Sequence, residues 1–176
     1  MRLIRWQAGA VIALMVGRAL QGGAASPEAA EGAWRRLQGL AGTWKGSSTK
    51  GWEEKIVLRL IAGGSVLLET SNFADDPQGS QAMATAYHKD GARLLLTHYC
   101  EAGNQPRLVA SSFEDGGATV TFTFLDGTNL PSRDRGHMDK VVIRFLDSEH
   151  FSSRWTWYED GHEKWLEDIR YERVRE

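Results

Sequence analysis

The residues best suited to chemistry lie in the segment His98-Tyr99-Cys100. Alternate side chains of a strand point to the same face, so His98 and Cys100 are expected to share a face with Leu94 and Leu96. If that face lines an interior, His98 and Tyr99 are candidate ligand-binding residues, and His98 is a candidate haem or metal ligand. The alternative is a structural histidine bonded to a neighbour. No residue with metal-ligand spacing accompanies His98, so the sequence predicts no metal and no cofactor.

A second imidazole, His137, lies two residues before Asp139. In an extended strand both would share a face with Val141 and Ile143, and a carboxylate beside an imidazole raises its pKa and orients its ring. Two interpretations stay open. The pair either faces the interior and forms a polar patch with His98, or it lies at the ragged end of a strand that leaves a long loop.

Arg107 and Glu167 are the other charged candidates. Arg107 shares a face with Val109, and its planar guanidinium suits a ligand carboxylate. The alternative is a surface arginine after a turn. Glu167 shares a face with Ile169, and an inward carboxylate must be paired or protonated. Arg107 and His98 are its candidate partners.

Trp155 and Trp157 alternate on one strand and supply large flat surfaces. A pocket lined by such side chains favours a flat or aliphatic ligand with one polar end. The alternative is that they fill the core, together with other aromatic residues of the same periodicity. These others are Trp52, Phe122, Phe124 and Trp165.

The elements that position these residues are strands, because apolar residues recur with a period of two from Thr43 onward. Turn sequences such as Lys89-Asp90-Gly91 and Glu159-Asp160-Gly161 separate about ten such segments. Short connections force antiparallel neighbours, and closure removes the two exposed edges of a large sheet. The predicted fold is therefore all-β, an up-and-down barrel of about ten antiparallel strands, rather than a sandwich with longer crossovers.

A short helix is expected before the strands. Ser26 and Pro27 are typical of a helix start, and Ala30, Trp34 and Leu37 lie on one face. Residues 1–25 resemble a signal peptide, with two arginines before a short apolar run and small residues at its end. We therefore expect a barrel domain over residues 26–176, a periplasmic or secreted location and no transmembrane segment in the mature chain.

Composition narrows the classes of partner. The 176 residues carry a formal net charge of -2, which gives no basic footprint for nucleic acid. The single cysteine, Cys100, excludes an internal disulfide, so stability must come from the core and from sheet closure.

The segment Gly42-Thr43-Trp44, at the head of the strands and after a short helix, resembles the Gly-x-Trp that opens the first strand of lipocalins. The chain is similar to the calycins, and most to small bacterial lipocalin-like domains of unknown function. The resemblance implies structural roles for Gly42 and Trp44, with Arg170 or Arg173 of the last strand stacked on Trp44. It also implies an Arg107 that anchors a carboxylate, as in fatty-acid-binding barrels. The glycine-rich opening of nitrobindins is missing, so haem binding is not implied.

The function expected from these residues is binding of a small, mostly hydrophobic molecule inside an exported, non-enzymatic barrel that is a monomer or a homodimer. A haem or metal protein using an inward histidine is the first alternative. A hydrolase or isomerase using the His, Asp and Glu residues is the second, although no nucleophile elbow, P-loop or zinc motif is present. A purely structural barrel filled by aromatic side chains is the third.

Overall fold

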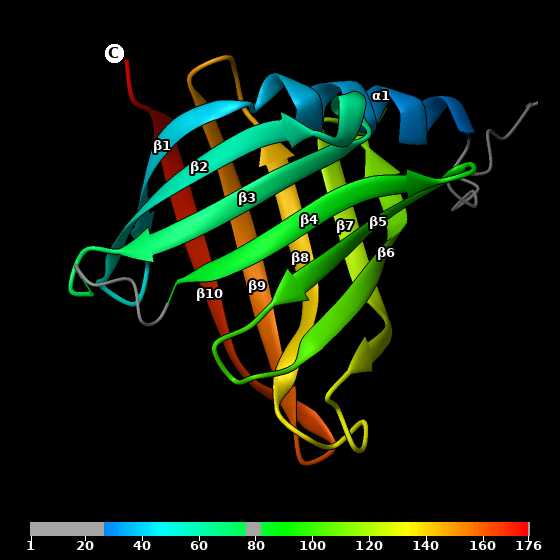
Figure 1. Ribbon diagram of the computed structural model, residues 1–176, viewed down its shortest axis with the longest axis vertical. Helices are drawn as coiled ribbons and strands as arrows, with labels where there is room; N and C mark the ends of the chain where they lie inside the picture. Colours follow the sequence, from blue (N-terminus) through cyan, green and yellow to red (C-terminus); the bar gives the residue numbers. More distant parts are fainter. Residues whose placement is uncertain (1–26, 77–81, 176) are drawn as a thin grey trace, which may run out of the picture.

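The computed structural model describes residues 27–76 and 82–175, with the backbone alone for Trp165 and Leu166. One helix is followed by ten antiparallel strands that form a closed barrel, which confirms the predicted fold; the helix lies at the top of the barrel in Figure 1. The segment interpreted as a signal peptide lies outside the described residues. The elements are α1 (Pro27–Gly39), β1 (Gly42–Ser48), β2 (Glu53–Ile61), η1 (Ala62–Gly64), β3 (Val66–Phe73), β4 (Met83–Asp90), β5 (Arg93–Tyr99), β6 (Gln105–Glu114), η2 (Asp115–Gly117), β7 (Thr119–Thr128), β8 (His137–Phe145), β9 (His150–Glu159) and β10 (His162–Arg173).

Each strand pairs with its neighbours in sequence, and β1 closes the sheet by pairing with both β2 and β10. Trp44 is the residue that shows this closure most directly, because it lies opposite Ile56 on one side and opposite Arg173 on the other. Most of the described connections are short turns, which antiparallel pairing allows. Because β1 closes the sheet, no strand of the described barrel is left as an unpaired edge.

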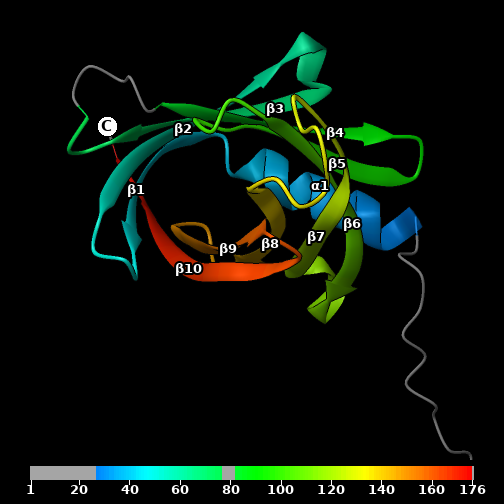
Figure 2. The same cartoon turned by 90° about the horizontal axis from the view of Figure 1, so that it is seen from below.

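Helix α1 covers one end of the barrel, as the end-on view in Figure 2 shows. Its Trp34 and Leu37 are buried in the same core cluster as Trp44, which is fully buried. The indole Nε1 of Trp44 donates a 2.8 Å hydrogen bond to the carbonyl of Leu40, just after the helix. The apolar face expected for this helix therefore packs against the closed end.

Arg173, rather than Arg170, stacks on Trp44, with the guanidinium carbon 4.1 Å from the centre of the indole ring. The same guanidinium donates 2.9 Å hydrogen bonds to the carbonyls of Gly39 and Ala41. Gly42 makes this approach possible, because its φ is +140° and a Cβ there would lie 2.6 Å from Nη1 of Arg173. Gly42, Trp44 and Arg173, which were predicted to be structural, therefore hold the last strand against the start of the first strand.

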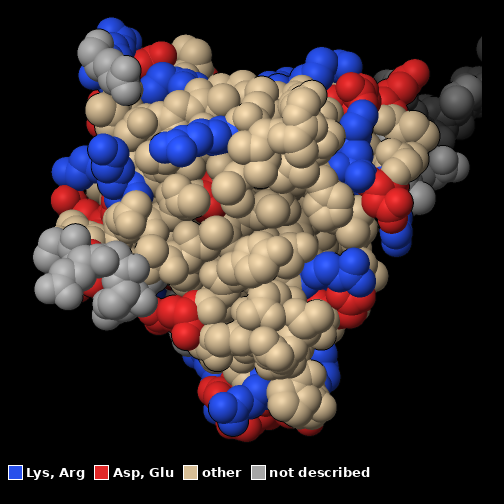
Figure 3. All heavy atoms as spheres, in the orientation of Figure 1, with Lys and Arg blue, Asp and Glu red and all other residues tan. Residues whose placement is uncertain are grey.

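Charges on the face seen in Figure 3 lie mainly around its margin, with both signs interspersed. Neither sign forms a continuous patch there, which agrees with the small net charge of the chain. Within the described residues, no helix has the length and apolar character needed to cross a membrane.

Candidate functional site

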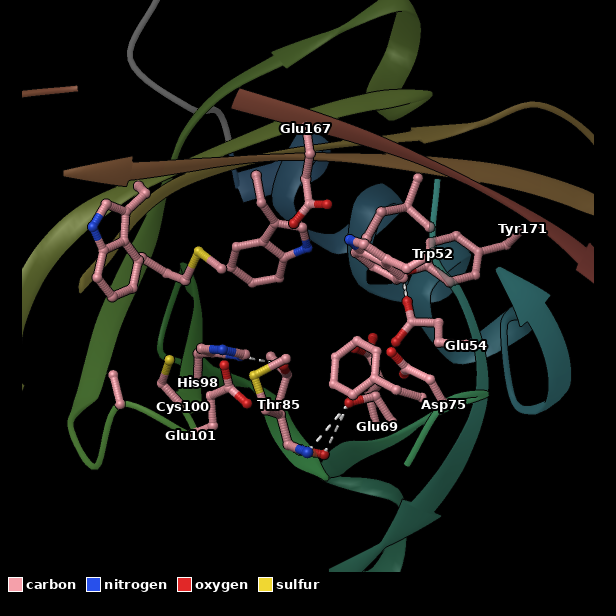
Figure 4. Close-up of a pocket in the computed structure, with 18 residues that line it drawn as sticks. Trp52, Glu54, Glu69, Asp75, Thr85, His98, Cys100, Glu101, Glu167 and Tyr171 are labelled. Atoms are coloured by element: carbon pink, nitrogen blue, oxygen red, sulfur yellow. Dashed lines mark hydrogen bonds between the residues drawn. The ribbon is translucent and has the colours of Figure 1, made fainter. Parts of the chain in front are cut away.

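A cavity of about 440 Å³ lies inside the barrel and is lined in part by the turns at the end opposite α1. The turns β1–β2 and β5–β6 lie at this end, together with the start of the β3–β4 connection (Figure 1). The wall of the cavity combines aromatic and carboxyl side chains, many of them labelled in Figure 4. The lining residues are Trp52, Glu54, Glu69, Ser71, Phe73, Asp75, Met83, Thr85, His98, Cys100, Glu101, Ala102, Met138, Trp155, Trp157, Glu167, Ile169 and Tyr171.

His98 lines this cavity from β5 and is 4% exposed. Its Nδ1 lies 3.0 Å from the hydroxyl of Thr85 on the neighbouring strand β4, and its ring centre lies 5.0 Å from that of Trp155. Burial lowers the pKa of His98 to about 4, so the imidazole is neutral near pH 7. Its buried Nε2 has no hydrogen-bond partner among the described residues.

Two carboxyl groups, Glu54 on β2 and Glu69 on β3, face the cavity from the side away from His98 (Figure 4). The hydroxyl of Tyr171 donates a 2.7 Å hydrogen bond to Glu54, and that of Tyr87 donates a 3.2 Å bond to Glu69. Burial is the main cause that raises the pKa of Glu54 to about 7 and that of Glu69 to about 8. Neighbouring negative charges raise these pKa values further: the charge of Glu54 raises the pKa of Glu69, and the charge of Glu167 raises the pKa of Glu54.

Glu167 enters the cavity wall from β10, as its alternation with Ile169 predicted. The expected pairing with Arg107 or His98 is wrong: Glu167 accepts a 2.8 Å hydrogen bond from the Ser48 hydroxyl of the adjacent strand β1. Burial raises the pKa of this carboxyl as well. Closure of the barrel brings Ser48 to Glu167, although 119 positions separate them in sequence.

Of the six residues predicted to contact a ligand, the structure brings three to the cavity, namely His98, Trp155 and Trp157. Tyr99 lies outside it and is 50% exposed, because it alternates with the inward His98. Arg107 also lies outside it, on the exposed surface, where its guanidinium forms a bidentate pair with Asp126 of β7. A surface arginine with a fixed partner does not reach the interior.

His137 is fully buried but does not line the cavity. Its ring lies between those of Phe124 and Tyr158, and its Nδ1 donates a 2.6 Å bond to the carbonyl of Arg135. The pairing of β8 with β9 shifts register after Met138, and Met138 takes the cavity position. The inward interpretation of His137 and Asp139 is therefore wrong, because a bulge interrupts the alternation on which it depended.

Glu54 and Glu69 are not among the predicted ligand-binding residues, although the alternation of buried residues along β2 and β3 indicates that both side chains point inward. Glu54 shares its periodicity with the buried Ile56 and Leu58, and Glu69 alternates with Leu67. A charged residue at a position whose neighbours two residues away are buried is the pattern that identifies an inward carboxylate.

No group of three or more His, Cys, Asp and Glu side chains with the geometry of a metal site is found in the described part of the chain. The cavity contributes carboxyl groups and a neutral imidazole, which act as hydrogen-bond acceptors or as proton donors and acceptors according to their protonation. The aromatic rings provide its apolar surface.

No protein-family model matches this chain, and no curated protein matches it. Among solved structures it is similar to the crystal structure of a protein of unknown function from the DUF3598 family of Nostoc punctiforme PCC 73102. The TM-score is 0.51 at 13% sequence identity, over 78% of this chain and 49% of that one, so this chain spans about half the length of its structural neighbour. At this identity the similarity extends to the fold alone: the chain is a closed ten-stranded antiparallel β-barrel.

Proposed function

We propose that this calycin-like barrel binds a small molecule with an apolar body and a polar end in its interior cavity. The observation that carries the proposal is the cavity itself, about 440 Å³ within a barrel whose opposite end is filled by Trp44 and α1. That volume is in the range of small-molecule sites, which typically measure about 300–1,000 Å³. Trp52, Trp155 and Trp157 supply flat apolar surface around it. These features disfavour a purely structural barrel packed solid with aromatic side chains.

The test uses N-phenyl-1-naphthylamine at neutral pH. This dye is uncharged there, and its fluorescence rises when it moves into an apolar site. Saturable enhancement is expected with the wild-type chain. Ser71→Phe should weaken it at least tenfold, because Ser71 is buried and lines the cavity. Thr70→Phe is the matched control, because Thr70 is the preceding residue of β3 and is exposed. Its enhancement should equal that of the wild type.

Met83→Trp provides a second obstruction if Ser71→Phe does not fold, because Met83 also lines the cavity. Thermal melting of each variant separates loss of binding from loss of structure. Two outcomes would refute ligand binding in this cavity. One is that the wild-type chain does not enhance the dye fluorescence, and the other is that folded variants with an obstructed cavity enhance it as strongly as the wild type.

Haem binding is a second candidate, supported by the unpartnered Nε2 of His98 in the cavity wall. Glu54, Glu69 and Glu167 oppose it, because the two propionates of haem would add negative charge to a wall that already carries carboxyl groups. Haem titration is decisive: a Soret band that is lost in His98→Ala would support this candidate, and an unchanged spectrum would remove it.

We further propose that residues 1–25 are a cleaved signal peptide and that the barrel acts outside the cytoplasm. The support is the basic start, the short apolar run and the small residues that follow. Expression of the full chain followed by N-terminal sequencing of the exported product tests this. A product that keeps residue 1 and stays in the cytoplasm would contradict it.

A further inference from the structure

Three carboxyl groups from three strands face the cavity, and for two of them, Glu54 and Glu69, the described residues provide no cationic partner. Glu54, Glu69 and Glu167 are bonded to the hydroxyls of Tyr171, Tyr87 and Ser48 respectively. No lysine or arginine is among the described residues that line the cavity. A carboxylate has room for about four hydrogen bonds, so one tyrosine hydroxyl leaves most of the acceptor capacity of Glu54 and of Glu69 unused.

An independent feature indicates that the cavity wall is built for a polar ligand. Nε2 of His98 is buried and unpartnered within the described residues, while Nδ1 is held by Thr85. A buried polar atom without a partner is costly, and such atoms in native proteins usually find a ligand or water. Figure 4 shows His98 and Thr85 on one side of the cavity, with Glu54 and Glu69 on the other.

We infer that the ligand is an organic amine, protonated in solution, whose ammonium group lies against Glu54 and Glu69 and whose apolar body extends toward His98. This inference rests on the proposed binding function and specifies the class of molecule. The ammonium supplies the donors that the two carboxylates lack. A hydrogen-bonding group on the far part of the ligand would meet Nε2 of His98.

An amine fits this wall better than a fatty acid or a neutral lipid does. An enclosed carboxylate is costly without a counter-charge, and an ammonium at hydrogen-bond distance offsets that cost. Trp52 and Phe73, whose rings form an edge-to-face pair 5.2 Å apart, add aromatic surface next to Glu54. The faces of such rings attract cations. A ligand carboxylate in the same place would be repelled.

The experiment compares three ligands that share an indole body, namely tryptamine, tryptophol and indole-3-acetate, by isothermal titration calorimetry with the wild-type chain at pH 8. Tryptamine is expected to bind at least tenfold more tightly than tryptophol, and indole-3-acetate should bind least. Glu54→Gln and Glu69→Gln should each reduce the ratio of tryptamine affinity to tryptophol affinity at least fivefold. Glu53→Gln is the matched control, because Glu53 lies on the outer face of β2 beside Lys45.

The outcomes separate this inference from the function on which it rests. Equal or tighter binding of tryptophol or indole-3-acetate, or an unchanged preference in both glutamine variants, overturns the amine assignment and leaves small-molecule binding in place. Binding of N-phenyl-1-naphthylamine without any binding of tryptamine has the same meaning. Failure of the dye and of all three indoles overturns both.

Discussion

The hydroxyl of Tyr171 donates a 2.7 Å hydrogen bond to Oε1 of Glu54, although a whole strand separates the two residues. Tyr171 lies on β10 and Glu54 on β2, and both pair with Gly46 of the intervening strand β1. A Cβ on Gly46 would lie 2.7 Å from the Tyr171 ring and 2.9 Å from Cγ of Glu54. The missing side chain of Gly46 is therefore what allows the tyrosine to reach one of the cavity carboxyl groups.

The first prediction follows from this packing. Gly46→Ala should lower the free energy of unfolding by about 1–3 kcal/mol, the usual cost of overpacking a filled interior. Chemical denaturation measures it. Gly32→Ala in α1 is the control, because nothing lies within 4 Å of a Cβ at Gly32. That control should be neutral or stabilising by up to about 1 kcal/mol. A Gly46→Ala chain as stable as the wild type would show that Tyr171 and Glu54 can move apart freely.

The second prediction concerns the contacts that Arg173 makes at the closed end of the barrel. Arg173→Lys should cost about 2–3 kcal/mol of unfolding free energy, since a lysine cannot stack on Trp44 and also donate to the carbonyls of Gly39 and Ala41. Arg170→Lys is the comparison, because Arg170 is exposed on the same strand and should change stability by less than about 0.5 kcal/mol. Equal losses in the two variants would argue against a special role for Arg173.

The closed barrel could be predicted from the sequence because each level of the pattern agreed. Alternating apolar residues, short polar turns and the absence of a helix between strands leave few arrangements other than an antiparallel meander. The position of Trp44 under α1 followed from the same reasoning and is confirmed by its complete burial. These are local regularities, and they add up along the chain.

The site was harder to predict, because it depends on register between strands that are distant in sequence. A bulge near Met138 moved His137 away from the cavity, and no local pattern marked that bulge. The partners of Glu54 and Glu167 come from strands that meet only when β1 pairs with β10. Such pairings become visible only in three dimensions, whereas the inward position of His98 required only its own strand.

The third prediction is a pH dependence of stability. Between about pH 4.5 and pH 7 the folded chain holds a proton on Glu54 that the unfolded chain releases, because the pKa of Glu54 is raised from 4.5 to about 7. Unfolding is therefore favoured as the pH rises through this window. Relative to Glu54→Gln, the wild type should lose on the order of 3 kcal/mol, at about 1.4 kcal/mol per unit of pKa.

Relative to Glu69→Gln, the wild type should show the same loss of stability, extended to about pH 8, where Glu69 loses its proton. The groups that face these two carboxyls are Glu167 and Tyr171 from β10 and Tyr87 from β4. Denaturation at several pH values measures the differences, with the exposed Glu53→Gln as a control that should parallel the wild type. A constant difference between wild type and Glu54→Gln across the range would contradict burial as the cause of the raised pKa.

The fourth prediction uses Cys100, the single cysteine, as a reporter of cavity occupancy. Cys100 lines the cavity, and burial raises the pKa of its thiol, so alkylation by iodoacetamide at pH 7.5 should be slower than that of a free thiol. Saturating N-phenyl-1-naphthylamine should slow it at least threefold further, because the bound dye blocks the approach from the cavity. Mass spectrometry gives the rates.

The control is a Cys100→Ser chain that carries Thr70→Cys. Position 70 is exposed, so the dye should have no effect on the alkylation rate of this cysteine. Equal Cys100 rates with and without bound dye would mean that the dye sits elsewhere.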